Sequence, residues 1–217
     1  MMSTMITPTR TEAHLAHLAQ RLRLERENRG WTLAELAARS GVSRAMVSKI
    51  ERGEASPTAA LLGRLSAAFN LTLSQLFARM EEQPKQTSGL VARAADQTVW
   101  RDPETGFIRR SLSPPDFGHP GRAPLELVWG ELPPSASISY LAASRAFIAD
   151  QQLVVISGTL SITLGATVHT LDAGDCLWFG PPTDVTFHNP AEARCRYVVA
   201  VLRGTPVTPR DLPRPGT

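Results

Sequence analysis

The chain has 217 residues and a net charge of +3, and 42% of its residues are hydrophobic. No apolar run approaches the roughly 18 residues of a membrane span, and the first residues lack the apolar core of a signal peptide. Two cysteines, Cys176 and Cys195, are too few for a disulfide framework. We interpret them as small buried residues, with a redox pair as the alternative. These features exclude a membrane-spanning or disulfide-rich protein and predict a cytoplasmic one.

The charge is distributed unevenly along the chain. Residues 1–80 carry a net +5, whereas residues 81–217 carry −2. A basic N-terminal part joined to a slightly acidic remainder fits a nucleic-acid contact confined to one end.

The N-terminal third has a helical pattern after a polar segment, 1–11, that we expect to be disordered. Residues 12–79 contain leucines at spacings of three and four, interrupted by helix stop signals. Thr32 and Glu35 form a capping-box pattern, and Ser43 and Ser56 are predicted N-caps. The stop signals predict five short helices packed as one helical domain.

The rest of the chain changes to short runs rich in Val, Ile, Thr and aromatic residues, separated by turn residues. Residues 80–90 are polar, contain Pro and Gly, and are predicted to be a linker. Residues 91–205 predict an all-β domain of eight or more strands. Residues 206–217 are expected to be a loose tail.

The most specific motif is LAELAARSGVSRAMVSKIERG, which begins at Leu33. Ala34, Leu36, Ala37 and other apolar residues at helical spacing are placed to be buried between two helices. The segment from Leu18 to Phe77 resembles the Xre/Cro-type family of repressor domains. This resemblance implies five helices that bind double-stranded operator DNA.

The resemblance implies that residues 43–51 are the recognition helix and lie in the DNA major groove. We expect Arg44 to be presented first and to contact guanine. Glu51 is expected to pair with Arg52 or with a neighbouring helix instead. The predicted DNA-binding residues are Thr32, Ser43, Arg44, Ala45, Ser48, Lys49 and Arg52.

The block from Gln152 to Asn189 resembles the cupin family of small β-barrels, through Gly158, the AGD turn at 173–175 and Asn189. Metal-binding cupins use two histidines and a carboxylate from a first motif and one histidine from a second. The corresponding positions hold Ser144 and Ala146 (or Arg145 and Phe147 with a gap one residue shorter), then Gln151 and Val185. Lacking all four ligands, the barrel is expected to hold no metal or other cofactor and no catalytic residue.

A barrel without metal can still hold a small molecule. The predicted pocket residues are Tyr140, Ser144, Ala146, Gln151, Trp178, Val185 and Phe187. An inward-facing arginine would suit a carboxylate or phosphate. We nevertheless expect Arg109, Arg110 and Arg145 to be exposed to solvent.

The sequence therefore predicts a multidomain α and β protein: a five-helix repressor-type domain followed by a cupin-like β-barrel. It favours a homodimeric transcription regulator, not an enzyme, whose metal-free barrel senses a small-molecule effector. One alternative is a cupin isomerase or oxygenase tethered to a DNA-binding head. Another is an antitoxin-like or phage-repressor-like regulator whose barrel is purely structural.

Overall fold

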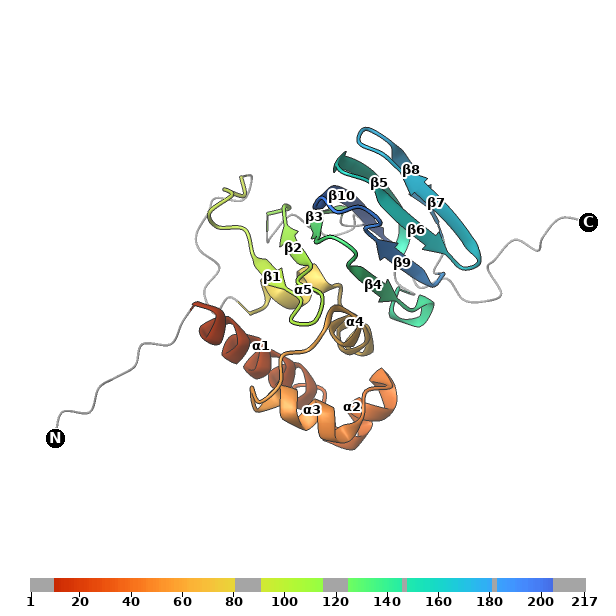
Figure 1. The fold of residues 1–217 in the computed structure, drawn as a ribbon. Coiled ribbons are helices and arrows are strands. Elements are labelled where there is room, and N and C mark those ends of the chain that lie inside the picture. The colour runs from red at the N-terminus through yellow and green to blue at the C-terminus, as the bar shows by residue number, and fades with distance from the viewer. Residues whose placement is uncertain (1–9, 81–90, 115–124, 146–147, 181–182, 205–217) are drawn as a thin grey trace, which may run out of the picture.

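The computed structural model describes residues 10–80, 91–114, 125–145, 148–180 and 183–204. Helices occupy its N-terminal part and two antiparallel sheets its C-terminal part (Figure 1). This arrangement confirms the predicted fold class. Within the described ranges, no helix is both long and apolar enough to cross a membrane.

Five helices form the N-terminal domain around a shared apolar core that includes Leu22, Leu36 and Phe69. Local capping fixes where several of them begin and end. Thr32 and Glu35 form the predicted capping box, and Gly41 ends its helix with a φ of 66°. The helices are α1 (Arg10–Glu27), α2 (Leu33–Ser40), α3 (Arg44–Glu51), α4 (Ala59–Ala68) and α5 (Leu73–Ala78).

Some local predictions for this domain were wrong. The N-cap of α4 is Thr58, not Ser56, because the Thr58 hydroxyl accepts from the amide of Leu61. Helix α1 already begins at Arg10, inside the segment predicted to be disordered. Ala34 is exposed rather than buried, since it lies on the solvent face of α2. The rest of the predicted linker after Met80 and the whole predicted tail lie outside the described residues.

The C-terminal domain has the two-sheet arrangement of a cupin-like barrel. A six-stranded sheet has the order β1-β2-β3-β10-β5-β8, and a four-stranded sheet has the order β4-β9-β6-β7. Between β4 and β5 lies a short 3₁₀ helix, η1 (Ala142–Arg145). The strands are β1 (Val99–Arg101), β2 (Ile108–Ser111), β3 (Leu125–Leu132), β4 (Ser137–Tyr140), β5 (Ile148–Ser157), β6 (Leu160–Leu164), β7 (Thr167–Leu171), β8 (Cys176–Phe179), β9 (Val185–His188) and β10 (Cys195–Arg203).

Aromatic rings join the two sheets across the barrel. Phe187 of β9 stacks on Tyr197 of β10 with ring centroids 5.6 Å apart. The Tyr197 ring lies over Gly130 of β3, where an added Cβ would stand 2.4 Å from Tyr197 Cζ. Residue 130 must therefore be glycine for this ring packing. Of the two cysteines, Cys195 is buried as expected, but Cys176 is exposed on the outward face of β8.

The helical domain is packed directly on the barrel, with α4 against η1 and β4 (Figure 1). Polar contacts cross this interface. Asp102, which is 2% exposed after β1, accepts a hydrogen bond from the amide of Ala59 at the first turn of α4 (2.5 Å). The hydroxyl of Thr72, the N-cap of α5, donates to Glu126 of β3 (2.6 Å). Phe77 of α5 stacks on the buried Trp100 of β1. The two domains thus share one polar and apolar interface.

Candidate functional site

Helix α3 presents one face to solvent and packs the other into the helical domain. The Ser43 hydroxyl caps its first turn by accepting from the amide of Met46 (3.2 Å). Val47 and Ile50 are each 1% exposed, whereas Arg44, Ala45 and Lys49 are exposed. The exposed face therefore carries Arg44 and the small Ala45 in its first turn and Lys49 in its last turn, which suits approach to a DNA groove.

An ion pair fixes α3 against α1. Arg26 donates through Nε to Glu51 Oε1 and through Nη2 to Glu51 Oε2, both at 2.8 Å. A third donor, Arg26 Nη1, binds the carbonyl of Trp31. Glu51 thus pairs with a neighbouring helix, as expected, and these bonds hold α3 in place.

Four of the predicted DNA contacts already have partners within the chain, one of which is the Ser43 hydroxyl that accepts from Met46. The amide and the hydroxyl of Thr32 both donate to Glu35 Oε2, at 2.7 and 2.9 Å. Arg52 pairs with Glu54 and also donates to the hydroxyl of Ser48. A phosphate contact by the Thr32 groups, or by the N–H groups that Arg52 already uses, has to replace an existing hydrogen bond. The Ser43 and Ser48 hydroxyls only accept in their recorded bonds and can still donate to a phosphate. Among the cations, Arg44 and Lys49 are therefore more readily available than Arg52.

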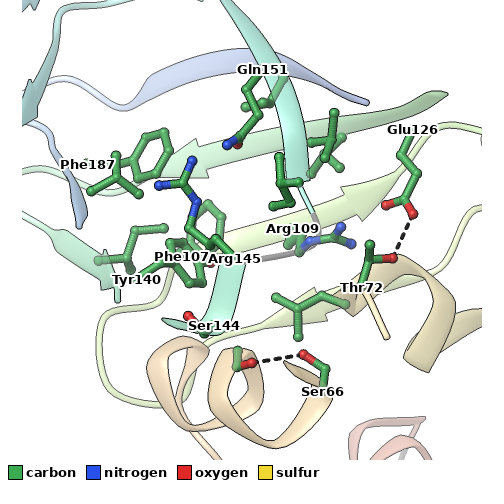
Figure 2. Close-up of a pocket in the computed structure, with 18 of the residues that line it drawn as sticks. Ser66, Thr72, Phe107, Arg109, Glu126, Tyr140, Ser144, Arg145, Gln151 and Phe187 are labelled. Carbon is green, nitrogen blue, oxygen red and sulfur yellow. Dashed lines mark hydrogen bonds between the residues drawn. The ribbon is translucent and has the colours of Figure 1, made fainter. Parts of the chain in front are cut away.

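A cavity of about 110 Å³ lies between the barrel and the helical domain (Figure 2). The helical domain supplies one wall, from α4 (Gly63 and Ser66) and from the start of α5 (Thr72 and Leu73). The barrel supplies the others, and the residues from it are Phe107, Arg109, Glu126, Val128, Ile138, Tyr140, Ser144, Arg145, Ile148, Gln151, Val185, Phe187, Tyr197, Val199 and Val201. A molecule in this cavity would contact both domains.

Arg109 is buried at the end of the cavity that adjoins α5, contrary to its predicted exposure. It is 7% exposed and donates to the hydroxyls of Ser74 (2.7 Å) and Ser111 (3.1 Å). Burial lowers its pKa, and the nearby charge of Glu126 opposes that shift. The docking of α5 therefore supplies part of the polar surroundings that allow this arginine to be buried.

Arg145, also predicted to be exposed, is 5% exposed at the end of η1. Its Nη1 donates to the carbonyl of Thr183 (2.5 Å), and its guanidinium lies 5.5 Å from the centroid of the Phe179 ring. Burial lowers its pKa to about 10. Neither its Nη2 nor the Nε2 of the equally buried Gln151 has a hydrogen-bond partner. Figure 2 shows both head groups directed into the same space.

The structure brings most of the predicted pocket residues together. Tyr140, Ser144, Gln151, Val185 and Phe187 all line the cavity. Burial raises the pKa of Tyr140 to about 12, so its phenol is neutral near pH 7. Ala146 lies outside the described residues.

Trp178 is not part of this site. It is 60% exposed on β8, and its Nε1 donates to Asp150 (3.2 Å). Alternation along β8 directs it away from the interior, whereas its neighbour Phe179 is buried.

The cavity occupies the position where the cupin resemblance places a metal. Of the residues at those positions, Val185 has no donor atom, and the hydroxyl of Ser144 donates to the carbonyl of Leu141 (2.7 Å). Gln151 offers a neutral amide beside the cationic Arg145. Within the described ranges, no group of three His, Cys, Asp or Glu side chains is arranged to hold a metal. The residues at this site do not fit a divalent cation.

Comparison with known proteins agrees with the geometry of the helical domain. The helix-turn-helix family HTH_3 matches residues 22–76, which include the end of α1 and all of α2 to α4. The HTH-type transcriptional regulator SutR of Escherichia coli (strain K12) is 27% identical over 179 residues, covering 81% of this chain and 88% of SutR. The chain is a helix-turn-helix transcriptional regulator with a cupin-like domain.

Two further matches cover one or both domains of the regulator. The HTH-type transcriptional regulator SlrR of Bacillus subtilis (strain 168) is 40% identical over 57 residues, which are 26% of this chain and 38% of SlrR. The crystal structure of an HTH_3 family transcriptional regulator from Vibrio cholerae has a TM-score of 0.70 at 22% identity. It covers 90% of this chain and 100% of that one. The likeness to the Vibrio cholerae protein thus extends over both domains of the fold.

Proposed function

We propose that the regulator binds an operator through α3 and that a small molecule in the interdomain cavity changes this binding. The observation that carries the proposal is that α4 and α5 of the DNA-binding domain form one wall of the cavity. An effector there contacts the DNA-binding domain directly. It alters operator affinity if it binds more tightly to one relative placement of the two domains than to another.

DNA recognition is assigned to the exposed face of α3, with Arg44 as the base-reading residue. We expect Arg44→Ala to lower affinity for the operator by about 1–3 kcal/mol, and to affect random DNA much less. The operator is obtained by selecting bound fragments from genomic DNA, and affinities are measured by fluorescence anisotropy. Arg23→Ala is the matched control, because Arg23 is an exposed arginine on α1. Equal losses on operator and random DNA would make Arg44 a phosphate contact instead.

Homodimerisation is proposed through the outer face of the six-stranded sheet. Neighbouring strands place two rows of side chains there, Trp129–Val198–Val154 and Leu127–Ala200–Gln152–Trp178. Leu127, Val154, Ile156 and Trp178 are each at least 37% exposed. A contiguous exposed apolar face of this kind favours a protein partner, and a second copy would provide the second recognition helix for a two-fold operator.

Light scattering coupled to size-exclusion chromatography tests this interface. Val154→Lys is expected to convert the dimer to monomer. Val168→Lys, on the exposed edge of the other sheet, is expected to leave the dimer intact. A monomeric wild-type chain, or a Val154→Lys dimer of unchanged stability, would contradict the assignment.

Coupling between the cavity and DNA binding is tested at Gly63 without knowledge of the effector. A Cβ added at Gly63 would stand 3.2 Å from Tyr140 Cδ1, so Gly63→Val presses α4 away from β4. We expect this variant to change operator affinity although it leaves α3 untouched. Ala60→Val is the control, since Ala60 is exposed on the same helix. Unchanged affinity in Gly63→Val would leave the cavity uncoupled from DNA binding.

We also propose that the regulator is cytoplasmic and carries out no catalysis. The cationic cavity supports a binding role better than a tethered metal-dependent cupin enzyme. Stoichiometric metal in the purified protein would favour the enzyme. A thermal-shift screen against metabolites separates sensing from a purely structural barrel, because only a ligand that binds the folded state raises the Tm.

A further inference from the structure

The interior of the barrel has an excess of positive charge. Arg109 and Arg145 line the cavity together with a single carboxylate, that of Glu126. Arg109 has Glu126 as a neighbouring charge, and the Glu126 carboxylate accepts from Thr72. Within the described residues, Arg145 forms no ion pair with a carboxylate. Its neighbouring negative charge is Asp184, which is exposed, lies outside the cavity lining and accepts from the amide of Ala142. Arg145 is thus the cation in the cavity that has no carboxylate facing it from the cavity wall.

Two hydrogen-bond donors at this point are buried and unused. They are Nη2 of Arg145 and Nε2 of Gln151, both on side chains that are 5% exposed. Leaving buried donors unsatisfied costs free energy, and the cost is greater for a charged group. Such groups in a cavity indicate that something else accepts their hydrogen bonds.

Strand pairing places the two donors close together. Gln151 of β5 is directly opposite Phe179 of β8, so their side chains are neighbours on the same face of the sheet. The guanidinium of Arg145 lies over that same Phe179 ring. Figure 2 shows the two head groups on the same side of the cavity. The pair therefore forms a compact two-donor site with one positive charge.

We propose that the cavity binds a small organic carboxylate whose oxygens accept hydrogen bonds from Arg145 Nη2 and Gln151 Nε2. This inference rests on the proposed function and names the chemical class of its effector. Two donors, one of them on a cation, match a carboxylate, which has one charge and two oxygens. A phosphate dianion would leave both charge and acceptor oxygens unsatisfied at the same site.

The lining and the volume of the cavity limit the polarity and the size of the ligand. Most of the wall around the site is apolar, with Ile138, Val185 and Phe187 from the barrel and Leu73 from α5. An engineered cavity of about 150 Å³ holds benzene. In proportion, a cavity of about 110 Å³ accommodates about four to five non-hydrogen atoms, those of the carboxylate included. The proposed ligand is a short aliphatic carboxylate.

Calorimetric titration of the full-length chain tests the proposal with matched pairs of probes. The carboxylates are acetate, propionate and butyrate, and their neutral partners are acetamide, propionamide and butyramide. We expect at least one carboxylate to bind at least tenfold more tightly than its amide. Arg145→Met is expected to weaken that binding at least tenfold and Gln151→Leu by a smaller factor. Arg196→Met should bind like the wild type, because Arg196 is an exposed arginine on β10.

A second measurement separates loss of the site from loss of the fold. Arg145→Met removes a buried charge that forms no ion pair, so the ligand-free variant should have a Tm equal to or above that of the wild type. Equal binding of carboxylate and amide would overturn the proposal. So would undiminished binding by Arg145→Met, or a Kd above about 10 mM for every carboxylate. Tight binding of inorganic phosphate in place of the carboxylates would assign a different anion.

The experiments can contradict the proposed regulation and the proposed ligand class independently of each other. A carboxylate that binds but leaves operator affinity unchanged supports the site and contradicts the regulation. A neutral molecule that changes operator affinity from this cavity supports the regulation and contradicts the carboxylate.

Discussion

Asp102 joins the two domains, and Asp102→Asn should loosen them. Its Oδ2 accepts from the amide of Ala59 at the start of α4. Its Oδ1 accepts from the amides of Glu104 (2.9 Å) and Thr105 (2.8 Å) in its own turn. Asparagine can keep the turn bonds through its remaining oxygen. It then directs an NH2 group at the Ala59 amide, so that two donors face each other.

The expected cost follows from the character of the lost bond. A hydrogen bond to a charged group is worth about 1.5–3 kcal/mol net, and the carboxylate also interacts favourably with the N-terminal end of the α4 dipole. We expect Asp102→Asn to destabilise docking by about 2 kcal/mol. That value corresponds to an increase of about 30-fold in the population of the undocked state.

Amide hydrogen exchange measures this opening locally. Peptides covering the first turn of α4 should exchange about 30-fold faster in Asp102→Asn, while those covering α3 change less. Asp175→Asn is the matched control, because Asp175 accepts a turn hydrogen bond from the amide of Asp172 in an exposed turn of the barrel. Unchanged exchange at the first turn of α4 would refute the assignment of Asp102 as an interdomain cap.

Three further outcomes are expected. Burial raises the pKa of Glu25, but hydrogen bonds from Arg21, Arg79 and Arg29 outweigh it and lower the pKa from 4.5 to about 2. Glu25 thus contributes stability above pH 4.5 that is lost as the pH falls toward 2. In urea denaturation at pH 7, Glu25→Gln should lower the free energy of unfolding by about 1–3 kcal/mol, a range that allows for the partial exposure of its arginine partners. A variant whose pH dependence matches the wild type would contradict this reasoning. Gly130→Ala should cost about 1–3 kcal/mol, because its methyl group displaces Tyr197; an unchanged denaturation midpoint would show that the ring can move freely. Val185→His should bind Zn²⁺ no more tightly than wild type in competition with a chelator, and tight binding would mean that the cavity already holds metal ligands.

Features that depend on neighbours in sequence could be predicted. The capping box of Thr32 and Glu35 needs only a spacing of three residues, and it is present as expected. The five helices and the β domain could likewise be predicted, from the periodicity of the hydrophobic residues and from the positions of the turn residues. The grouping of Ser144, Gln151 and Val185 around one cavity was accessible only through the spacing of the cupin resemblance.

Features that depend on the packing of the two domains could not be predicted. Arginine is usually exposed, and nothing in the sequence around Arg109 or Arg145 indicates otherwise. Their burial depends on partners distant in sequence. Arg109 is 35 residues from its partner Ser74, and Arg145 is 38 residues from Thr183. Asp102 accepts from the first amide of α4, which is 43 residues away in the sequence. Single-sequence patterns contain no signal for such pairs, whereas co-variation between the members of each pair would reveal them.

The shared wall of the cavity also bears on how such proteins are recombined. Thr72 and Ser74 come from the DNA-binding domain, yet their hydroxyls bind Glu126 and Arg109 inside the barrel interface. A chimera that joins this barrel to an unrelated DNA-binding domain would open the cavity. It would also leave the buried Arg109 without its partner Ser74. A chimera that exchanges the DNA-binding domain therefore has to keep α4 and α5 together with the barrel. The junction between the two parent proteins then lies between α3 and α4, within the helical domain.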